Sequence, residues 1–178
     1  MRFYIISGEA SGDLHGSNLI RELKIIYPQG KFRCWGGDMM EKQGGVIIKH
    51  YRDLAFMGFK EVILNIRTIK RNFKFCFEDV LEYRPDAIIL IDYPGFNLRV
   101  ARFAKEHKIP VLYYISPQVW AWKQSRVKKI RAYVDRMFAI LPFEKDFYEK
   151  FGYVVEFTGN PLLDDIEEYI EENRMSFE

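Results

Sequence analysis

The 178-residue chain has little cysteine, no long apolar run and almost no net charge. Its two cysteines, Cys34 and Cys76, lie far apart without the spacing of metal ligands, so we expect a reduced, cytosolic protein. No apolar run approaches the ~20 residues that span a bilayer. No cleavage site follows the short run at residues 2–7, which predicts no signal peptide. The net charge of +2 does not indicate a nucleic-acid partner.

Several catalytic signatures are also absent. The three histidines, His15, His50 and His107, show no metal-site pairing with carboxylates, so we expect no metal. The glycine-rich turn at residues 8–13 is followed by no Gly-Lys-Ser/Thr and is no dinucleotide fingerprint. No Gly-x-Ser-x-Gly elbow is present, which gives a hydrolase triad little support.

What the chain does contain is a regular alternation of strand and helix patterns. It predicts strands at 3–7, 32–35, 46–48, 87–91, 109–115, 137–141 and 154–157. Helices are expected at 13–26, 39–43, 59–83, 96–107, 119–131 and 143–150, and an acidic helix from Pro161 onwards. This order predicts an α/β protein with a doubly wound, mostly parallel sheet of six or seven strands and helices on both faces.

The stretch from Ala87 to Asn97 contains the clearest predicted strand, at residues 87–91, and the turn that ends it. Its five apolar residues alternate with no polar residue, which is typical of a central parallel strand buried on both faces. Pro94 and Gly95 end the run, so Asp92 lies at the carboxyl end of the strand, where open α/β sheets bind ligands. Two interpretations of Asp92 follow: a residue of the chemistry, or one that caps the next helix and orders the turn.

The first strand ends in a glycine-rich turn, Gly8–Asp13, that leads into a helix. Asp13 is predicted to cap that helix, and His15 is close enough to touch a ligand. Backbone amides near Ser11 and Gly12 can receive an anion or sugar hydroxyls. The carboxylates of Glu9 and Asp13 favour hydroxyl groups over a bare phosphate. The alternative is an ordinary capped turn.

Residues 51–77 carry more apolar and aromatic side chains than a loop needs, beside basic residues at helical spacing. That pattern is typical of an interfacial amphipathic helix, or of a helix docked on the sheet with a solvated basic face. We favour a surface that meets lipid.

Ser116 and Trp120 follow another buried strand, ahead of a basic segment. Trp120 and Trp122 point to different sides of a helix, so at most one is core and the other can stack on a sugar or an acyl chain. No nucleic-acid-binding module surrounds the basic residues, and anionic lipid or a substrate phosphate explains them as well.

Five motifs occur in an order that resembles the lipid-A-disaccharide synthase family of GT-B glycosyltransferases. They are Ser7-Gly8-Glu9-Ala10-Ser11-Gly12-Asp13, Ala55-Phe56-Met57-Gly58, Ile91-Asp92-Tyr93-Pro94-Gly95-Phe96-Asn97, Ser116-Pro117-Gln118-Val119-Trp120-Ala121-Trp122 and Leu141-Pro142-Phe143-Glu144. The resemblance covers residues 1 to about 165. It implies a Rossmann-like half of a GT-B fold, with residues 166–178 as an acidic helix leading towards a nucleotide-binding domain.

The resemblance also implies a reaction and a site. Such enzymes transfer diacylglucosamine from UDP to diacylglucosamine 1-phosphate, invert the anomeric centre, need no metal or cofactor and bind peripherally to the inner face of the bacterial inner membrane. Asp92 corresponds to the general base, which takes the proton of the acceptor's 6-hydroxyl. The expected acceptor-binding residues are Gly8, Glu9, Ser11, Gly12, Asn97, Ser116 and Trp120. The expected membrane or acyl contacts are Leu54, Phe56, Met57, Phe59, Ile63, Arg67, Lys70 and Arg71.

Two residues depart from the family pattern. Gly95 stands where many members carry a second Asp, and Asn160 where His is usual. Two other functions remain open: another GT-B-like hexosyltransferase or UDP-sugar epimerase half, and a non-catalytic lipid-docking or flavodoxin-like module. The half-domain by itself is expected to transfer little or no sugar.

Overall fold

The computed structural model describes residues 1–54, 66–122 and 124–174. The strands are β1 (Arg2–Ile6), β2 (Lys31–Gly36), β3 (Val46–His50), β4 (Ala87–Ile91), β5 (Val111–Ile115), β6 (Arg136–Ala139) and β7 (Glu156–Phe157). The helices are α1 (Ala10–Ile26), α2 (Asp38–Lys42), α4 (Ile66–Tyr83), α5 (Pro94–Glu106), α6 (Val119–Trp122), α7 (Val127–Tyr133), α8 (Pro142–Glu149) and α9 (Pro161–Arg174). Two short 3-10 helices, η1 (Tyr51–Leu54) and η2 (Gln124–Arg126), complete the described elements.

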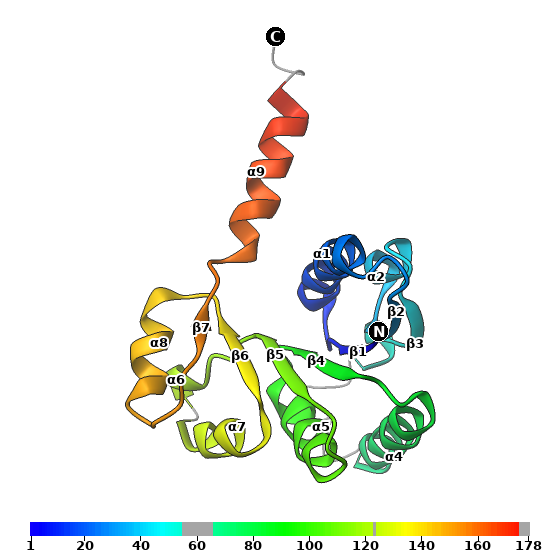
Figure 1. Ribbon diagram of the computed structural model, residues 1–178, viewed down its shortest axis with the longest axis vertical. Coiled ribbons are helices and arrows are strands. Elements are labelled where there is room, and N and C mark those ends of the chain that lie inside the picture. The colour runs from blue at the N-terminus through cyan, green and yellow to red at the C-terminus, as the bar shows by residue number, and fades with distance from the viewer. Residues whose placement is uncertain (55–65, 123, 175–178) are drawn as a thin grey trace.

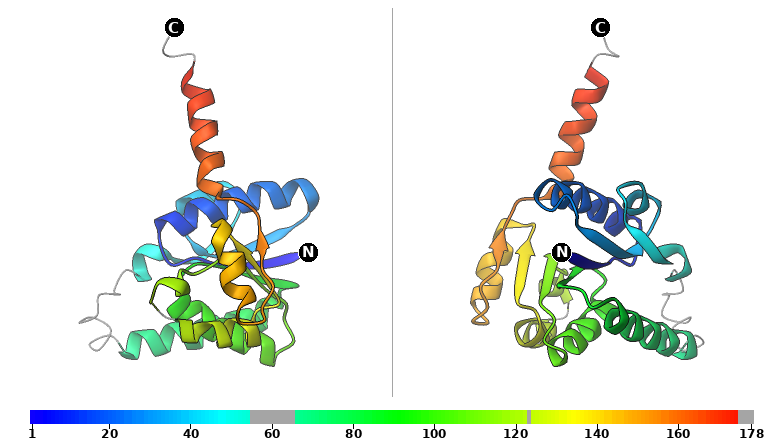
Figure 2. Two further views of the ribbon diagram at one scale, coloured as in Figure 1. Left: turned by 90° about the vertical axis from the view of Figure 1, so that its left-hand side faces the viewer. Right: turned by 45° about the vertical axis from the view of Figure 1, so that its right-hand side comes forward.

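The seven strands form one sheet in the order β3-β2-β1-β4-β5-β6-β7, and every pairing is parallel. Helices α1 and α2 cover one face, and α4, α5 and α7 cover the other (Figures 1 and 2). The doubly wound, mostly parallel sheet predicted from the alternation is therefore confirmed. After β1 the chain adds β2 and β3 on one side of β1. It then returns and places β4 on the other side of β1, so the strand order reverses between β1 and β4.

The core confirms that the central strands are buried on both faces. Every residue of β4 is buried. Ile88 and Leu90 pack with Tyr4 in a core cluster on one face, whereas Ile89 and Ile91 belong to a second cluster on the other. The period-2 alternation of side chains across the strand explains this division.

The predicted cap of the first helix is wrong. α1 begins at Ala10, after an extended Glu9 whose side chain makes no capping bond. The carboxylate of Asp13 instead accepts the backbone N–H groups of Gly37 at 2.7 Å, Met39 at 3.0 Å and Met40 at 3.2 Å. Asp13 therefore satisfies the free amides at the start of α2, a helix distant in sequence.

The single basic helix predicted over 119–131 is also wrong in detail. The described residues instead form three separate elements, α6, η2 and α7. Gln124 and Ser125 begin η2, and serine competes with helical hydrogen bonds through its side chain, which favours such a break. The helix predicted from Phe59 is described only from Ile66 onwards.

A buried polar network fixes α4 to the sheet. Asp79 of α4 accepts a hydrogen bond from the Tyr4 hydroxyl at 2.8 Å and forms an ion pair with Arg33. The indole N–H of Trp35 donates in turn to the Tyr4 hydroxyl at 3.0 Å. Because each buried polar group finds a partner, the network holds α4 in one position on β1 and β2.

The last helix, α9, extends away from the sheet (Figure 1). Asn160 caps it, since its Oδ1 accepts the backbone N–H of Leu162 at 3.1 Å. The asparagine at this position is therefore a helix cap. Tyr169 is 67% exposed, and several further apolar side chains of α9 are exposed with it. The domain boundary at about residue 165 stays a prediction.

Candidate functional site

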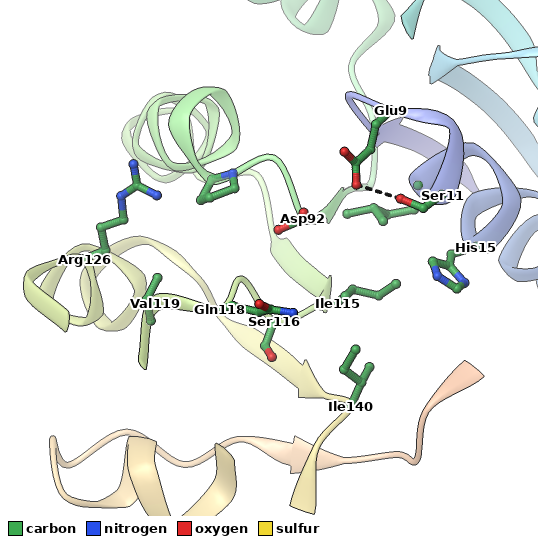
Figure 3. A pocket seen from close by; sticks show the side chains of 13 residues that line it. Glu9, Ser11, His15, Asp92, Ile115, Ser116, Gln118, Val119, Arg126 and Ile140 are labelled. Atoms are coloured by element: carbon green, nitrogen blue, oxygen red, sulfur yellow. Dashed lines mark hydrogen bonds between the residues drawn. The ribbon is translucent and has the colours of Figure 1, made fainter. Parts of the chain in front are cut away.

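A pocket lies where the strand order reverses, beyond the carboxyl ends of β1 and β4. Its volume is about 370 Å³. Residues after β1 (Glu9, Ser11, Gly12), after β4 (Asp92) and after β5 (Ser116) line it. Open α/β sheets bind ligands at such a reversal, because the two loops diverge and leave a crevice. Figure 3 shows the side chains of Glu9, Ser11, Asp92 and Ser116 around the opening.

Asp92 and Tyr93 hold an unusual backbone conformation at the edge of the pocket. Their φ angles are 40° and 49°, so two successive non-glycine residues are left-handed. Such a conformation costs about 1–3 kcal/mol per residue and persists only where the surroundings enforce it. The strain lies at the residue that the sequence marks as the candidate base.

Two buried side chains enforce that conformation. The carbonyl oxygen of Asp92 accepts hydrogen bonds from Asn97 Nδ2 at 2.8 Å and from the Tyr113 hydroxyl at 2.5 Å. Asn97 also donates to the carbonyl of Ile91 at 3.2 Å. Both side chains are fully buried. Asn97 was predicted to bind the acceptor, but it supports the loop of Asp92 from behind and does not line the pocket.

Gly8 also acts through packing. A Cβ atom on Gly8 would lie 2.5 Å from the ring of Tyr93, so only glycine lets the two turns approach this closely. Gly12 does line the pocket, and a Cβ there would lie 2.7 Å from Cβ of Ser7. The first turn and the loop of Asp92 are therefore in direct contact at the reversal.

Glu9 and Ser11 form the exposed wall of the pocket on the α1 side (Figure 3). The Ser11 hydroxyl donates to Glu9 Oε1 at 2.7 Å. The pair presents carboxylate and hydroxyl oxygens to the opening, which suits sugar hydroxyls as hydrogen-bond donors.

Ser116 lies deeper and is 2% exposed. Its hydroxyl donates to Glu144 Oε1 at 2.5 Å, and Glu144 Oε2 accepts the backbone N–H groups of Ile140 and Leu141. Sequence reasoning missed this role of Glu144. The signal was present, because Glu144 stands three residues after Leu141, the spacing at which a glutamate reaches back to the start of its helix.

Trp120 stands outside the pocket lining. Its ring meets Phe143 edge-on at 4.9 Å, and its indole N–H is buried with no hydrogen-bond partner among the described residues. His15 lines the pocket, which agrees with the expectation that it can touch a ligand.

The pocket also has a cationic side that the sequence did not single out. Arg126, the last residue of η2, lies across Asp92 from Glu9, Ser11 and His15 (Figure 3). In the sequence it is one of several basic residues, and nothing local distinguishes it. The pocket thus combines a carboxylate pair with one guanidinium.

The electrostatics favour Asp92 as a base. Burial raises the pKa of Asp92 above its ordinary value, and the nearby Glu9 carboxylate raises it further. The backbone N–H of Tyr93 and the Arg126 guanidinium act in the opposite direction on this pKa. A raised pKa makes the ionised carboxylate a better proton acceptor.

Two substitutions should move the pKa of Asp92 in opposite directions. Glu9→Gln removes a negative neighbour and should lower it, whereas Arg126→Gln removes a positive neighbour and should raise it. Carboxyl ¹³C titration by NMR measures both shifts. Lys128→Gln is the control. It also removes a positive charge, from an exposed residue two positions after Arg126, and should leave the pKa of Asp92 unchanged. Shifts of the same sign in the two variants would contradict these electrostatics.

The expected membrane residues divide into three groups. Leu54 is 5% exposed and belongs to the core, so the prediction that it contacts lipid is wrong. Arg67, Lys70 and Arg71 are exposed on α4. Phe56, Met57, Phe59 and Ile63 lie outside the described residues. Within the described ranges, no helix is long and apolar enough to cross a bilayer.

Comparison with solved structures agrees with the fold. The chain resembles a UDP-GlcNAc 2-epimerase from Neisseria meningitidis, with a TM-score of 0.70 and 13% identity, over 99% of this chain and 51% of that one. A UDP-N-acetylglucosamine 2-epimerase from Rickettsia bellii gives a TM-score of 0.66 at 13% identity, over 97% and 48%. At this identity the likeness shows a shared fold only.

Sequence comparison is more specific. The lipid-A-disaccharide synthase of Trichlorobacter lovleyi is 46% identical over 93% of this chain and 43% of its own length. That of Geobacter sulfurreducens is 46% identical over 92% and 42%. The chain thus spans less than half the length of these curated relatives. A family model described as lipid-A-disaccharide synthetase matches residues 3–177, and the chain belongs to that family.

Proposed function

We propose that residues 1–165 form the acceptor-binding domain of a lipid-A-disaccharide synthase, with Asp92 as general base. The observation that carries the proposal is Asp92 itself, a carboxylate with a raised pKa at the strand-order reversal. Family membership supports the reaction, and the pocket chemistry supports a hydroxylated acceptor.

The acceptor is a diacylated glucosamine 1-phosphate. Asp92 accepts the proton of its 6-hydroxyl while that oxygen attacks the anomeric carbon of the UDP-linked diacylglucosamine. The bond from that carbon to the UDP oxygen breaks, so UDP leaves and the anomeric centre inverts. Glu9 and Ser11 orient the acceptor's hydroxyl groups, because they present oxygen acceptors beside Asp92.

The remaining residues of the proposed site act through position. Asn97, like Tyr113, holds the carbonyl of Asp92, and Gly8 allows Tyr93 to pack against the first turn. Ser116 shapes the pocket floor through Glu144. Fixing a base within hydrogen-bond reach of its proton is a recognised source of rate acceleration.

The donor is proposed to bind in a nucleotide-binding domain, towards which residues 166–178 lead. The protein is proposed to act at the cytoplasmic face of the inner membrane. Exposed Arg67, Lys70 and Arg71 on α4 support this, because basic residues attract anionic lipid headgroups by about 1 kcal/mol each.

A chimera tests the proposal. Residues 1–165 would replace the matching segment of a full-length synthase from the family. The chimera should release UDP and form disaccharide from the two acylated sugars, whereas the 178-residue chain alone should release no detectable UDP. Unacylated sugars separate the alternatives, because another hexosyltransferase or an epimerase would turn them over equally well. Failure of a folded chimera on the acylated pair would overturn the proposal.

A further inference from the structure

A second cavity, of about 760 Å³, lies between α4, α5 and α7. These three helices run beside one another on the same face of the sheet (Figures 1 and 2). We call this cavity the α5 groove. It shares Pro94 and Arg126 with the pocket of Asp92, so the two cavities adjoin. The first turn of α5, which follows Asp92, separates them.

Aromatic rings line the α5 groove in a fixed arrangement. Phe77 of α4 stacks on Phe103 of α5 with 4.1 Å between ring centroids. Phe73 stacks on the buried Phe96 at 4.4 Å. The buried network of Asp79 anchors α4 to the sheet, so we expect these rings to keep their positions when a ligand binds. An apolar chain laid on them would lose contact with water at little cost in side-chain entropy.

The charges around the α5 groove have one dominant sign. Arg99, Arg102, Arg126 and Lys129 line it, against one described carboxylate, that of Glu106. Glu106 Oε1 already accepts a hydrogen bond from Arg102 Nε at 2.9 Å. Arg99 lies over the ring of Phe73, with 5.0 Å from its guanidinium carbon to the ring centroid. The groove is therefore apolar at its floor and cationic at its edges.

We propose that the α5 groove binds an acyl chain of the acceptor, with its cations facing the acceptor's phosphate. The inference rests on the proposed function, because that function supplies an acylated sugar phosphate beside Asp92. An acyl chain matches the aromatic floor, and a phosphate matches the surplus of guanidinium and ammonium groups. Continuity with the pocket lets one molecule occupy both cavities. Arg126 stands at their junction, where the sugar meets its substituents.

The test measures binding to the 178-residue chain by ¹⁵N NMR and calorimetry. The probes are glucosamine 1-phosphate and diacylated glucosamine 1-phosphates with chains short enough to stay monomeric. Only the acylated probes should shift the amides of Phe77 and Phe103, and affinity should rise by up to about fourfold for each added methylene. Arg99→Gln with Lys129→Gln should weaken acylated binding about fivefold. Ser125→Trp, an exposed change within the groove lining, should weaken it at least ~tenfold by obstruction.

A matched double variant, Lys128→Gln with Lys145→Gln, removes the same charge from exposed sites outside the groove lining and should change affinity less than ~twofold. Acylated probes that shift Ser11 and Asp92 but spare Phe77 would overturn the groove and leave the proposed function intact. If the chain binds a simple alkyl phosphate in the groove but does not bind the acylated sugar phosphates, both the proposed function and the acceptor's acyl chain as occupant would be overturned. Groove variants that weaken binding to phosphatidylglycerol vesicles, and spare the monomeric probe, would assign the surface to the bilayer and overturn the proposal.

Discussion

Asp92→Asn in the active chimera should lower the rate of sugar transfer at least ~100-fold, because the amide cannot accept the proton of the attacking hydroxyl. The substitution preserves side-chain volume. It also leaves the hydrogen bonds of Asn97 and Tyr113 in place, since both go to the Asp92 backbone carbonyl. Initial rates of UDP release at saturating acceptor give the measurement.

The pH dependence of the same chimera provides a second criterion. The base works ionised, so the rate with Asp92 should fall as the pH drops through its raised pKa. Any residual rate of the Asn variant should lack this decline, because the titrating carboxyl is gone. Glu9→Gln serves as the comparison and should move the decline to lower pH. A rate within ~threefold of the parent in the Asn variant would rule out Asp92 as the base and would favour the non-catalytic binding module.

Asp13→Ala should lower the free energy of unfolding by about 3 kcal/mol, with a range of about 2–5. The carboxylate is 2% exposed and accepts three backbone N–H groups around the start of α2. Truncation leaves these donors without an acceptor and removes a helix cap. Urea unfolding followed by circular dichroism measures the loss.

Two companions calibrate that result. Asp13→Asn keeps one acceptor oxygen and should cost less than the alanine variant. Asp146→Ala removes an exposed aspartate and should change stability by less than about 0.5 kcal/mol. A loss below about 1 kcal/mol for Asp13→Ala would mean that water replaces the carboxylate at α2.

The sequence sufficed for the features that depend on local pattern. Ala87–Ile91 is uninterrupted by polar residues, which identified a strand buried on both faces and put Asp92 at its carboxyl end. The alternation of elements predicted the doubly wound sheet. These inferences succeed because strand burial and helix periodicity are encoded within a few residues.

Features that depend on distant partners escaped prediction. Asp13 fits the local pattern of a helix cap, yet α1 begins three residues earlier, at Ala10, so Asp13 lies inside the first turn. Its carboxylate is therefore directed at α2, where it accepts the N–H of Gly37. The hydrogen bond from the Tyr113 hydroxyl to the Asp92 carbonyl can be predicted only if β4 and β5 are known to be neighbours in the sheet. A leucine is equally typical of a lipid-facing surface and of a protein core, so the sequence could not tell which of these Leu54 occupies. Its contacts in the packed core decide it.

The pairing of β1 with β4 also bears on how the chain acquires its site. The amide of Arg2 bonds the carboxylate of Asp86, 84 residues away, and the two strands pair from there towards the pocket. Bringing the ends of so long a segment together costs conformational entropy, and contacts within β1 and α1 do not offset that cost. We therefore expect this pairing to be slow relative to local helix formation. During refolding, helical circular dichroism should therefore recover before the chain regains affinity for its ligand.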